Sequence, residues 1–188
     1  MVEIVSYQTN WSSEFSEISS LLRSGLGTLA LRIDHIGSTS VPELAAKDII
    51  DIQITAKHLD DKIISAMTSL AYVQQKEIRQ DHCPPGNPGA ESQWEKLFFI
   101  QPPHQRRTHV HIRIQGRANQ RYALLFRDYL RQNSDTARSY AEIKRRLALN
   151  LADPHSYPKV KDPVVDMIYF AAEQWAETTH WQEGKPDA

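Results

Sequence analysis

The sequence predicts an α/β (α+β) fold in which helices flank the faces of one mixed β-sheet. Near the N-terminus, apolar residues recur every three or four positions, which is typical of an amphipathic helix. A β-branched run, IIDIQIT, has the period of two expected of a strand. Helical and strand-like segments then alternate along the chain, and this order favours a sheet covered by helices over a sandwich or a bundle.

The first third of the chain is expected to contain one helix and two strands. The helix covers Ser12 to Leu31, and its apolar stripe should pack on one face of the sheet. A strand from Arg32 to Ile36 ends at the small-residue turn GSTS, residues 37–40, whose backbone N–H groups can face outward. The IIDIQIT strand follows from Ile49 to Thr55.

The middle of the chain is expected to supply a second helix and three more strands. The helix covers Asp60 to Leu70. Strands are expected at Tyr72–Arg79, Lys96–Gln101 and Thr108–Ile114. Between the first two of these strands, DHCPPGNPGAESQ (residues 81–93) is rich in proline and glycine and predicts an irregular loop, either a lid or a surface excursion without a role.

From about residue 117 onward the chain is expected to be helical. Two apolar stripes, one around Tyr122 and one around Tyr140, predict two helices. A last helix is expected to begin with Asp162 as N-cap and Pro163 at the first helical position. Residues 1–178 are therefore expected to form a single domain with a helical C-terminal part, and residues 179–188 a frayed tail.

Composition argues against several classes of protein. The 188 residues carry a formal net charge of −1, so no overall positive field would attract nucleic acid or an anionic membrane. No apolar run approaches the ~18 residues needed to cross a bilayer, and the N-terminal residues lack the pattern of a signal peptide, so a cytoplasmic location is expected. Cys83 is the single cysteine, which excludes an internal disulfide framework and a CxxC zinc site.

The segment HIGSTSVPELAAKDIIDI, residues 35–52, gives the strongest indication of chemistry. The turn with Gly37, Ser38 and Ser40 is expected to bind phosphate, because small residues let backbone N–H groups approach an anion closely. Asp51 on the following strand is expected to hold a divalent metal ion, the alternative being a structural polar residue at the end of the sheet. A two-metal site needs a second carboxylate, but Gln53 occupies the position two residues later.

His109 and His111 project from one face of the expected strand THVHIRI. Imidazoles at this spacing can share a metal ion or act as acid and base near neutral pH, although strand histidines without such a role are as common. If this strand neighbours that of Asp51, the three side chains converge as catalytic residues and as ligands of one ion, Mn²⁺, Mg²⁺, Zn²⁺ or Ni²⁺. Two imidazoles and one carboxylate suit the transition metals better than Mg²⁺. His35 is either a further candidate or a buried, hydrogen-bonded histidine.

Two Tyr–Lys pairs at a spacing of four are candidate ligand-binding residues. Tyr140 and Lys144 lie one helical turn apart, and Tyr157 and Lys161 repeat the spacing in an expected loop. Each ring can stack on a base while its lysine reaches a phosphate. Each pair taken alone is more often a surface pair with a solvated lysine.

These residues together resemble the GrpB family, from Val5 to about Phe170. HIGSTSVPELAAKDIIDI is similar to the family signature HIGSTAVPGLAAKPIIDI, with Glu43 where glycine is usual and Asp48 where proline is usual. YQTNWSSEF, THVHIRI and LLFRDYLR resemble further family segments, and the tyrosines and lysines of the two pairs fall on later family positions. The resemblance implies a nucleotidyltransferase-like fold, a domain that in some relatives is fused to dephospho-CoA kinase.

Three functions follow as hypotheses. The first is metal-dependent nucleotidyl transfer to or from a nucleotide or another phosphate-containing small molecule. The second is a module that binds a nucleotide or a CoA-like ligand without catalysis, which the missing second carboxylate favours. The third is a small metal-dependent hydrolase, for which the sequence offers no nucleophile.

Overall fold

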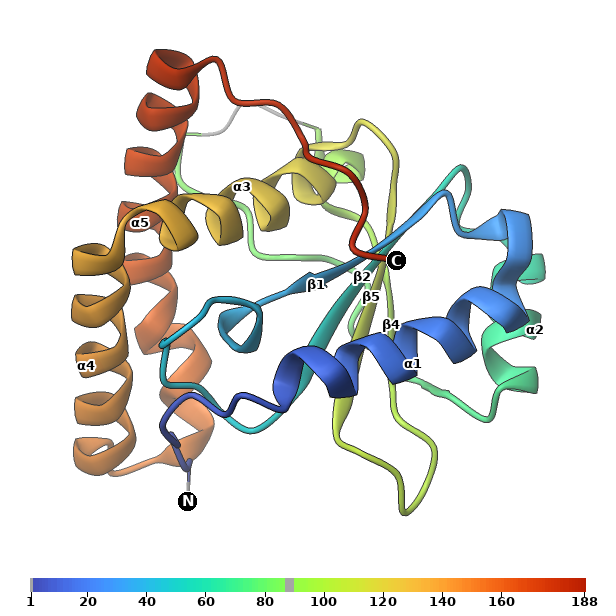
Figure 1. The fold of residues 1–188 in the computed structure, drawn as a ribbon, viewed down its shortest axis with the longest axis horizontal. Coiled ribbons are helices and arrows are strands. Elements are labelled where there is room, and N and C mark those ends of the chain that lie inside the picture. Colours follow the sequence, from blue (N-terminus) through green and yellow to red (C-terminus); the bar gives the residue numbers. More distant parts are fainter. Residues whose placement is uncertain (1, 87–89) are drawn as a thin grey trace.

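A five-stranded mixed sheet forms the centre of the protein. The computed structural model describes residues 2–86 and 90–188, and residues 87–89 of the expected irregular loop lie outside the described residues. The strands lie in the order β1-β2-β5-β4-β3 (Figure 1). Their bounds are Arg32–Ile36 (β1), Ile50–Ala56 (β2), Val73–Gln74 (β3), Leu97–Ile100 (β4) and Thr108–Ile114 (β5). β2 and β5 pair in parallel and the other neighbours antiparallel, so the expected mixed sheet is confirmed.

Over the residues that the structure describes, five α-helices pack around the sheet in two groups. The first group is α1 (Trp11–Leu26) and α2 (Asp61–Ser69), which pack against each other on one side. The second group is α3 (Ala118–Gln132), α4 (Ser134–Asn150) and α5 (Tyr157–Thr179), which gather on the other side (Figure 1). No helix among the described residues is both long enough and apolar enough to span a bilayer.

The two faces of the sheet differ in polarity because of the period of two in its strands. Ile52 and Ile54 of β2, with Val110 and Ile112 of β5, point toward α1 and α2 and belong to the main hydrophobic core. The alternate residues of the same strands point to the opposite face and are polar: Asp51, Gln53, His109, His111 and Arg113. α3 crosses this polar face, where the Gln120 carbonyl accepts a hydrogen bond from Gln53. The functional candidates therefore share one face.

Three expectations about the elements were wrong. The strand expected over residues 72–79 is only two residues long, because the Ile78 N–H turns back to the Gln75 carbonyl. α5 begins at Tyr157 rather than at Pro163, so Asp162 is not its N-cap and Pro163 lies inside it. Tyr157 and Lys161, which were expected in a loop, lie on this helix. Pro158 near the helix start explains the earlier beginning, since the first N–H groups of a helix need no intrahelical partner.

The C-terminal segment is ordered against β1, where the sequence predicts a frayed tail. After α5 the chain runs back to the outer edge of β1 (Figure 1). The Ala188 N–H donates to the Ile33 carbonyl at 3.0 Å, and the His35 N–H donates to the Asp187 carboxylate at 2.9 Å. An edge strand leaves backbone groups unpaired, and this segment pairs some of them.

Candidate functional site

The three expected metal ligands meet where β1 ends and where β2 and β5 begin. Asp51 and His109 are direct partners in the parallel β2–β5 ladder, and His111 follows two residues later on the same face. Nδ1 of His109 lies 3.3 Å from Oδ1 of Asp51. One ligand atom from each of the three side chains lies within 4.8 Å of the others, and all three residues are half-buried. Their convergence depends on β2 and β5 being neighbours.

This donor set fits a single divalent ion. One carboxylate oxygen and two imidazole nitrogens come from rigid strands, and the opening toward the adjacent cavity leaves positions for other ligands. The Phe98 ring packs beside both imidazoles, with centroids 5.1 Å from His109 and 4.8 Å from His111. This packing restricts the orientation of the rings.

His111 has a cationic neighbour that the sequence did not point to. Nζ of Lys96 lies 3.3 Å from Nδ1 of His111 and 2.6 Å from Oδ1 of Asp81. Burial and then the charges of Lys96 and Arg113 lower the pKa of His111 well below its ordinary value. An ammonium group can only donate a hydrogen bond, so Nδ1 of His111 accepts it. The imidazole is therefore neutral near pH 7.

Gln53 occupies the position where a two-metal site would need a second carboxylate, and its side chain belongs to a buried hydrogen-bond network. Arg113 donates to Oε1 of Gln53 at 2.5 Å, and Nε2 of Gln53 donates to the Gln120 carbonyl at 3.0 Å. Arg113 also binds both oxygens of Asp81. Burial alone would raise the pKa of Asp81, but Arg113 and Lys96 hold it well below its usual range. Gln53 thus serves as both acceptor and donor, which a carboxylate cannot do.

The turn after β1 lies directly against Asp51. Gly37 has a φ of 69°, a left-handed conformation that favours glycine. A β-carbon at this position would lie 2.9 Å from Cβ of Asp51 and closer still to its Oδ2, so the turn and the carboxylate can approach only through glycine. Ser38 and Thr39 then line the adjacent cavity. Ser40 instead is buried, and its hydroxyl donates to the Gly37 carbonyl at 2.6 Å.

His35 is a buried structural residue rather than a fourth ligand. Its ring stacks on Phe15 with centroids 4.7 Å apart, and Nε2 lies 3.0 Å from the Thr39 hydroxyl. Because that hydroxyl donates its own proton to the Ile49 carbonyl, it accepts from His35. Burial lowers the pKa of His35 to about 4, so the ring is neutral.

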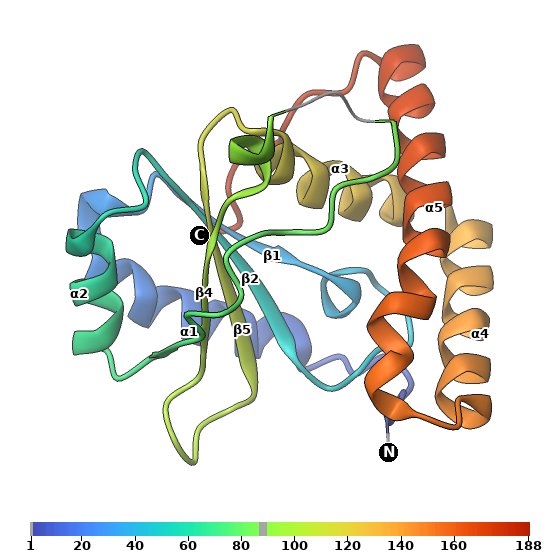
Figure 2. The same ribbon diagram turned by 180° about the vertical axis from the view of Figure 1, so that it is seen from behind.

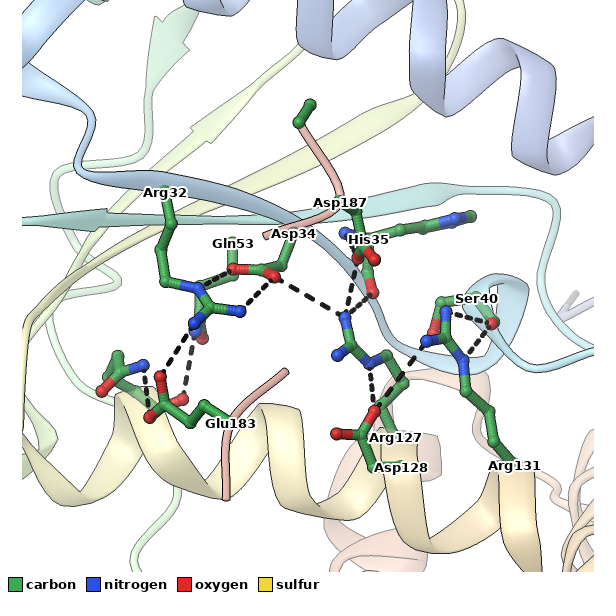
Figure 3. A network of polar contacts seen from close by, with 12 residues as sticks. Arg32, Asp34, His35, Ser40, Gln53, Arg127, Asp128, Arg131, Glu183 and Asp187 are labelled. Carbon is green, nitrogen blue, oxygen red and sulfur yellow. Dashed lines mark hydrogen bonds and ion pairs between the residues drawn. The ribbon is translucent and has the colours of Figure 1, made fainter. Parts of the chain in front are cut away.

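Two arginines of α3 donate hydrogen bonds to backbone carbonyls at the turn (Figure 3). Arg131 donates twice to the Ser40 carbonyl, at 3.0 and 2.9 Å. Arg127 donates to the His35 carbonyl at 3.1 Å and to the Asp187 carboxylate at 2.7 Å. Hence α3 and the C-terminal segment fix the backbone on both sides of the turn.

A cavity of about 500 Å³ opens beside the metal candidates. Its wall includes Lys47, Lys96, Lys144 and Lys161 together with Asp51 and Asp162. Burial lowers the pKa of each of the four lysines, and that of Lys144 falls to about 7 as Lys161 and Arg145 add repulsion. Lys96 is already paired with Asp81, but the other three lysines still outnumber the two carboxylates of this wall. A bound anion would neutralise the excess of positive charge.

The two tyrosines of the Tyr–Lys pairs are buried beneath lysines. Nζ of Lys144 lies 4.5 Å from the centroid of Tyr140, and Nζ of Lys47 lies 4.3 Å from that of Tyr157. Both rings are almost fully buried, so they support the ammonium groups by cation–π contact. Lys144 also donates to the Ser38 hydroxyl at 2.8 Å and to the Ala45 carbonyl. Lys144 therefore connects α4 to the turn.

Lys47 and Lys96 complete the site, and the sequence analysis missed both. Lys47 lies within the signature segment, two residues before the IIDIQIT strand, where its closeness to Asp51 could have indicated it. Lys96 directly precedes the LFFI strand and belongs to no recognisable motif. Its place depends on the β4–β5 pairing.

Comparison with known proteins gives one matching family and several relatives. The family model described as GrpB protein matches residues 1–170. A dephospho-CoA kinase of Mycolicibacterium paratuberculosis is 32% identical over 196 residues, which cover 96% of this chain and 48% of the kinase. The UPF0157 protein PA4798 of Pseudomonas aeruginosa is 35% identical over 89% of this chain and 66% of that protein. The chain thus spans about half the length of the kinases that it matches.

Two solved structures share the fold. The crystal structure of the conserved protein GrpB from Enterococcus faecalis aligns with a TM-score of 0.71 and 29% identity, over 92% of this chain and 99% of that chain. A chain of the GLD-2/RNP-8 complex aligns with a TM-score of 0.50 and 14% identity, over 86% of this chain and 51% of that chain. At that identity the second likeness concerns the fold alone.

Proposed function

This chain belongs to the GrpB family, and from that premise we propose that its cavity binds a nucleotide or a related phosphate-bearing molecule together with a divalent metal ion. We propose further that the bound pair undergoes metal-dependent nucleotidyl transfer. The observation that carries the proposal is the meeting of two features in one cavity. Its wall contains both the Asp51–His109–His111 donor set and the four lysines.

The lysines and the turn are the proposed phosphate subsite. Lys47, Lys144 and Lys161 would neutralise phosphate oxygens, and the bound anion would raise the lowered pKa of each lysine again. Ser38 lies at the end of Lys144 and can donate its hydroxyl to the same anion. Burial makes these contacts stronger than they would be on the surface.

Asp51, His109 and His111 are the proposed metal ligands. A divalent ion held there would act as a Lewis acid on a phosphoryl oxygen. In the transfer itself, an acceptor oxygen bonds to the α-phosphorus and the bond to diphosphate breaks. The acceptor hydroxyl loses its proton to solvent, and the lysines neutralise the charge of the departing diphosphate.

The relatives support a ligand of this kind. The matched kinases are named for dephospho-CoA, which contains a nucleotide, although this chain covers only about half of their length. A cavity of about 500 Å³ is of ordinary size for a small-molecule site.

Binding without transfer is the second candidate. Gln53, in the place of a second carboxylate, is hydrogen-bonded to Arg113 and to the Gln120 carbonyl. The donor set therefore contains one carboxylate, whereas two-metal enzymes use more. A module of this kind would keep the phosphate subsite and the single ion.

Incubation with labelled nucleoside triphosphates and either Mn²⁺ or Mg²⁺ tests both candidates. Release of diphosphate by the wild type, with loss in Asp51→Asn, is expected for transfer. Saturable binding without release would instead support the second candidate. Absence of binding at millimolar nucleotide, in a folded protein, would contradict both.

A further inference from the structure

A second, smaller cavity adjoins the first on the polar face. It measures about 260 Å³, and Gly37, Asp51, His111 and Lys161 line both cavities. α3, α5 and the segment that follows β3, residues 75–86, enclose it. Figure 2 shows this segment passing between the sheet and α5. His82 of this segment binds Asp166 of α5 at 2.9 Å, which ties the two together. The metal candidates therefore lie between two adjoining spaces.

Aromatic side chains form much of the wall of the second cavity. Trp94 meets Tyr122 edge to face, with centroids 5.8 Å apart, and Tyr122 lies nearly parallel to Phe126 at 6.3 Å. All three residues line the cavity, and Val165 adds an aliphatic side. A wall of this kind suits a flat apolar ring better than a phosphate.

Arg113 lines the second cavity but not the first, and a neighbouring carboxylate neutralises its charge. Arg113 is bound through two nitrogens to Asp81, with distances of 2.8 and 2.9 Å. Lys161 is shared with the larger cavity. The excess positive charge therefore lies on the Lys47 and Lys144 side, and a ligand with one anionic end would place that end there.

Two residues that line the aromatic cavity each have a buried polar atom without a hydrogen-bond partner in the described part of the chain. Among the described residues, neither Nε1 of Trp94 nor Oδ1 of Asn119 makes a hydrogen bond. Both residues line the cavity and are at least 98% buried, with 2% and 1% of their surface exposed. The first atom is a donor and the second an acceptor. Buried polar groups are nearly always paired, so an unpaired donor and acceptor beside one cavity call for a bound group.

We propose that the second cavity binds the nitrogen heterocycle of the same ligand, a planar ring that accepts from Trp94 and donates to Asn119. The inference rests on the proposed function, because it takes the phosphates to lie in the lysine-lined cavity. The ligand then spans both cavities and passes the metal ligands between its two ends. Phosphates alone would occupy only the larger of the two cavities.

The Trp94→Phe variant tests the ring subsite with little disturbance. It removes the indole N–H, which has no partner among the described residues, and keeps an aromatic ring. Trp175→Phe is the matched control, because Trp175 packs on Tyr129 rather than in either cavity. Affinities of both variants and wild type are measured by calorimetry with Mn²⁺, for the four ribonucleoside triphosphates and for inorganic tripolyphosphate.

The expected result is selective. At least one nucleoside triphosphate should bind wild type more tightly than tripolyphosphate does, and Trp94→Phe should weaken that ligand roughly three- to tenfold, the value of one hydrogen bond. Tripolyphosphate affinity should be equal in all three proteins. Tyr122→Leu, which removes part of the wall instead, should show the same selectivity if Trp94→Phe folds poorly.

Three results would overturn the inference. If tripolyphosphate binds wild type as tightly as every nucleoside triphosphate, or if Trp94→Phe and Tyr122→Leu leave the preferred nucleotide unaffected, the second cavity does not bind the ring, while the phosphate subsite stands. If wild type binds neither class of ligand, the ring subsite and the proposed function are both overturned.

Discussion

A metal ion bound at His111 would exclude the hydrogen bond that Lys96 makes to this ring. Nδ1 of the neutral ring accepts a hydrogen bond from Lys96, so its proton is on Nε2. An ion at Nδ1 would displace Lys96, and an ion at Nε2 would move the proton to Nδ1, which could then no longer accept. The hydrogen bond between Lys96 and His111 therefore competes with metal binding at this ring.

Replacing Lys96 with methionine should raise the affinity for Mn²⁺ or Zn²⁺. The change removes the competing donor and a nearby positive charge, and Asp81 keeps its two bonds to Arg113. We expect a gain of about tenfold, which corresponds to ~1.4 kcal/mol. Calorimetry with Lys47→Met as the control, a lysine of the same cavity, measures the difference. A weaker or unchanged affinity in Lys96→Met would show that the two do not compete.

The pH dependence of anion binding should report Lys144. Burial lowers the pKa of this lysine to about 7, and a bound phosphate would raise it again. A group whose pKa rises on binding contributes fully below the lower pKa and is lost as the pH passes the higher one. Tripolyphosphate affinity without metal should thus fall as pH rises from about 7 to 9, with proton uptake.

Calorimetry at pH 8 in buffers of different ionisation enthalpy measures that uptake. Lys144→Met should bind more weakly at pH 7 and take up fewer protons. An equal number of protons in both proteins would assign the uptake to another group.

Among the elements, the turn after β1 depends on segments far away in the sequence. Its composition predicts a small-residue turn, and the left-handed φ of Gly37 agrees with that. Glu43 has a φ of 64°, which explains why glycine is usual at that position. The support from Arg127 and Asp187 could not be predicted, because a local pattern does not tell which distant charge will lie behind a turn (Figure 3).

Asp187→Asn should lower the free energy of unfolding by about 1–2 kcal/mol, because the Asp187 carboxylate accepts from the His35 N–H and from a buried arginine. Only 4% of the Arg127 side chain is exposed, so its partners are poorly replaced by water. Urea denaturation measures the change. Asp135→Asn is the control, since the Asp135–Arg138 pair is exposed and should contribute close to nothing. Equal effects would mean that the C-terminal segment does not stabilise β1.

For the whole molecule, periodicity predicts the sheet and which strand residues share a face, but the convergence of the three candidate ligands also needs β2 and β5 to be neighbours. The period of two places Asp51 on the opposite face of the sheet from Ile52 and Ile54 of its strand, and it places His109 and His111 on one face. The lysine cavity could not be predicted, because Lys47, Lys96, Lys144 and Lys161 come from four separate segments. The start of α5 was mistaken because proline is typical of the first turn of a helix and disfavoured inside it, whereas Pro163 lies inside α5.

The central claim is that one cavity binds a divalent ion through Asp51, His109 and His111. Titration of the purified chain with Mn²⁺, Zn²⁺ and Mg²⁺, followed by calorimetry, measures it most directly in wild type, Asp51→Asn, His111→Ala and Asp48→Asn. Asp48 is the control because it lies in the same signature segment but binds Trp11 and Arg106. We expect one site that prefers Mn²⁺ or Zn²⁺ to Mg²⁺, retained in Asp48→Asn and weakened at least about tenfold in the other two variants. Equal metal binding in all four folded proteins would contradict the account.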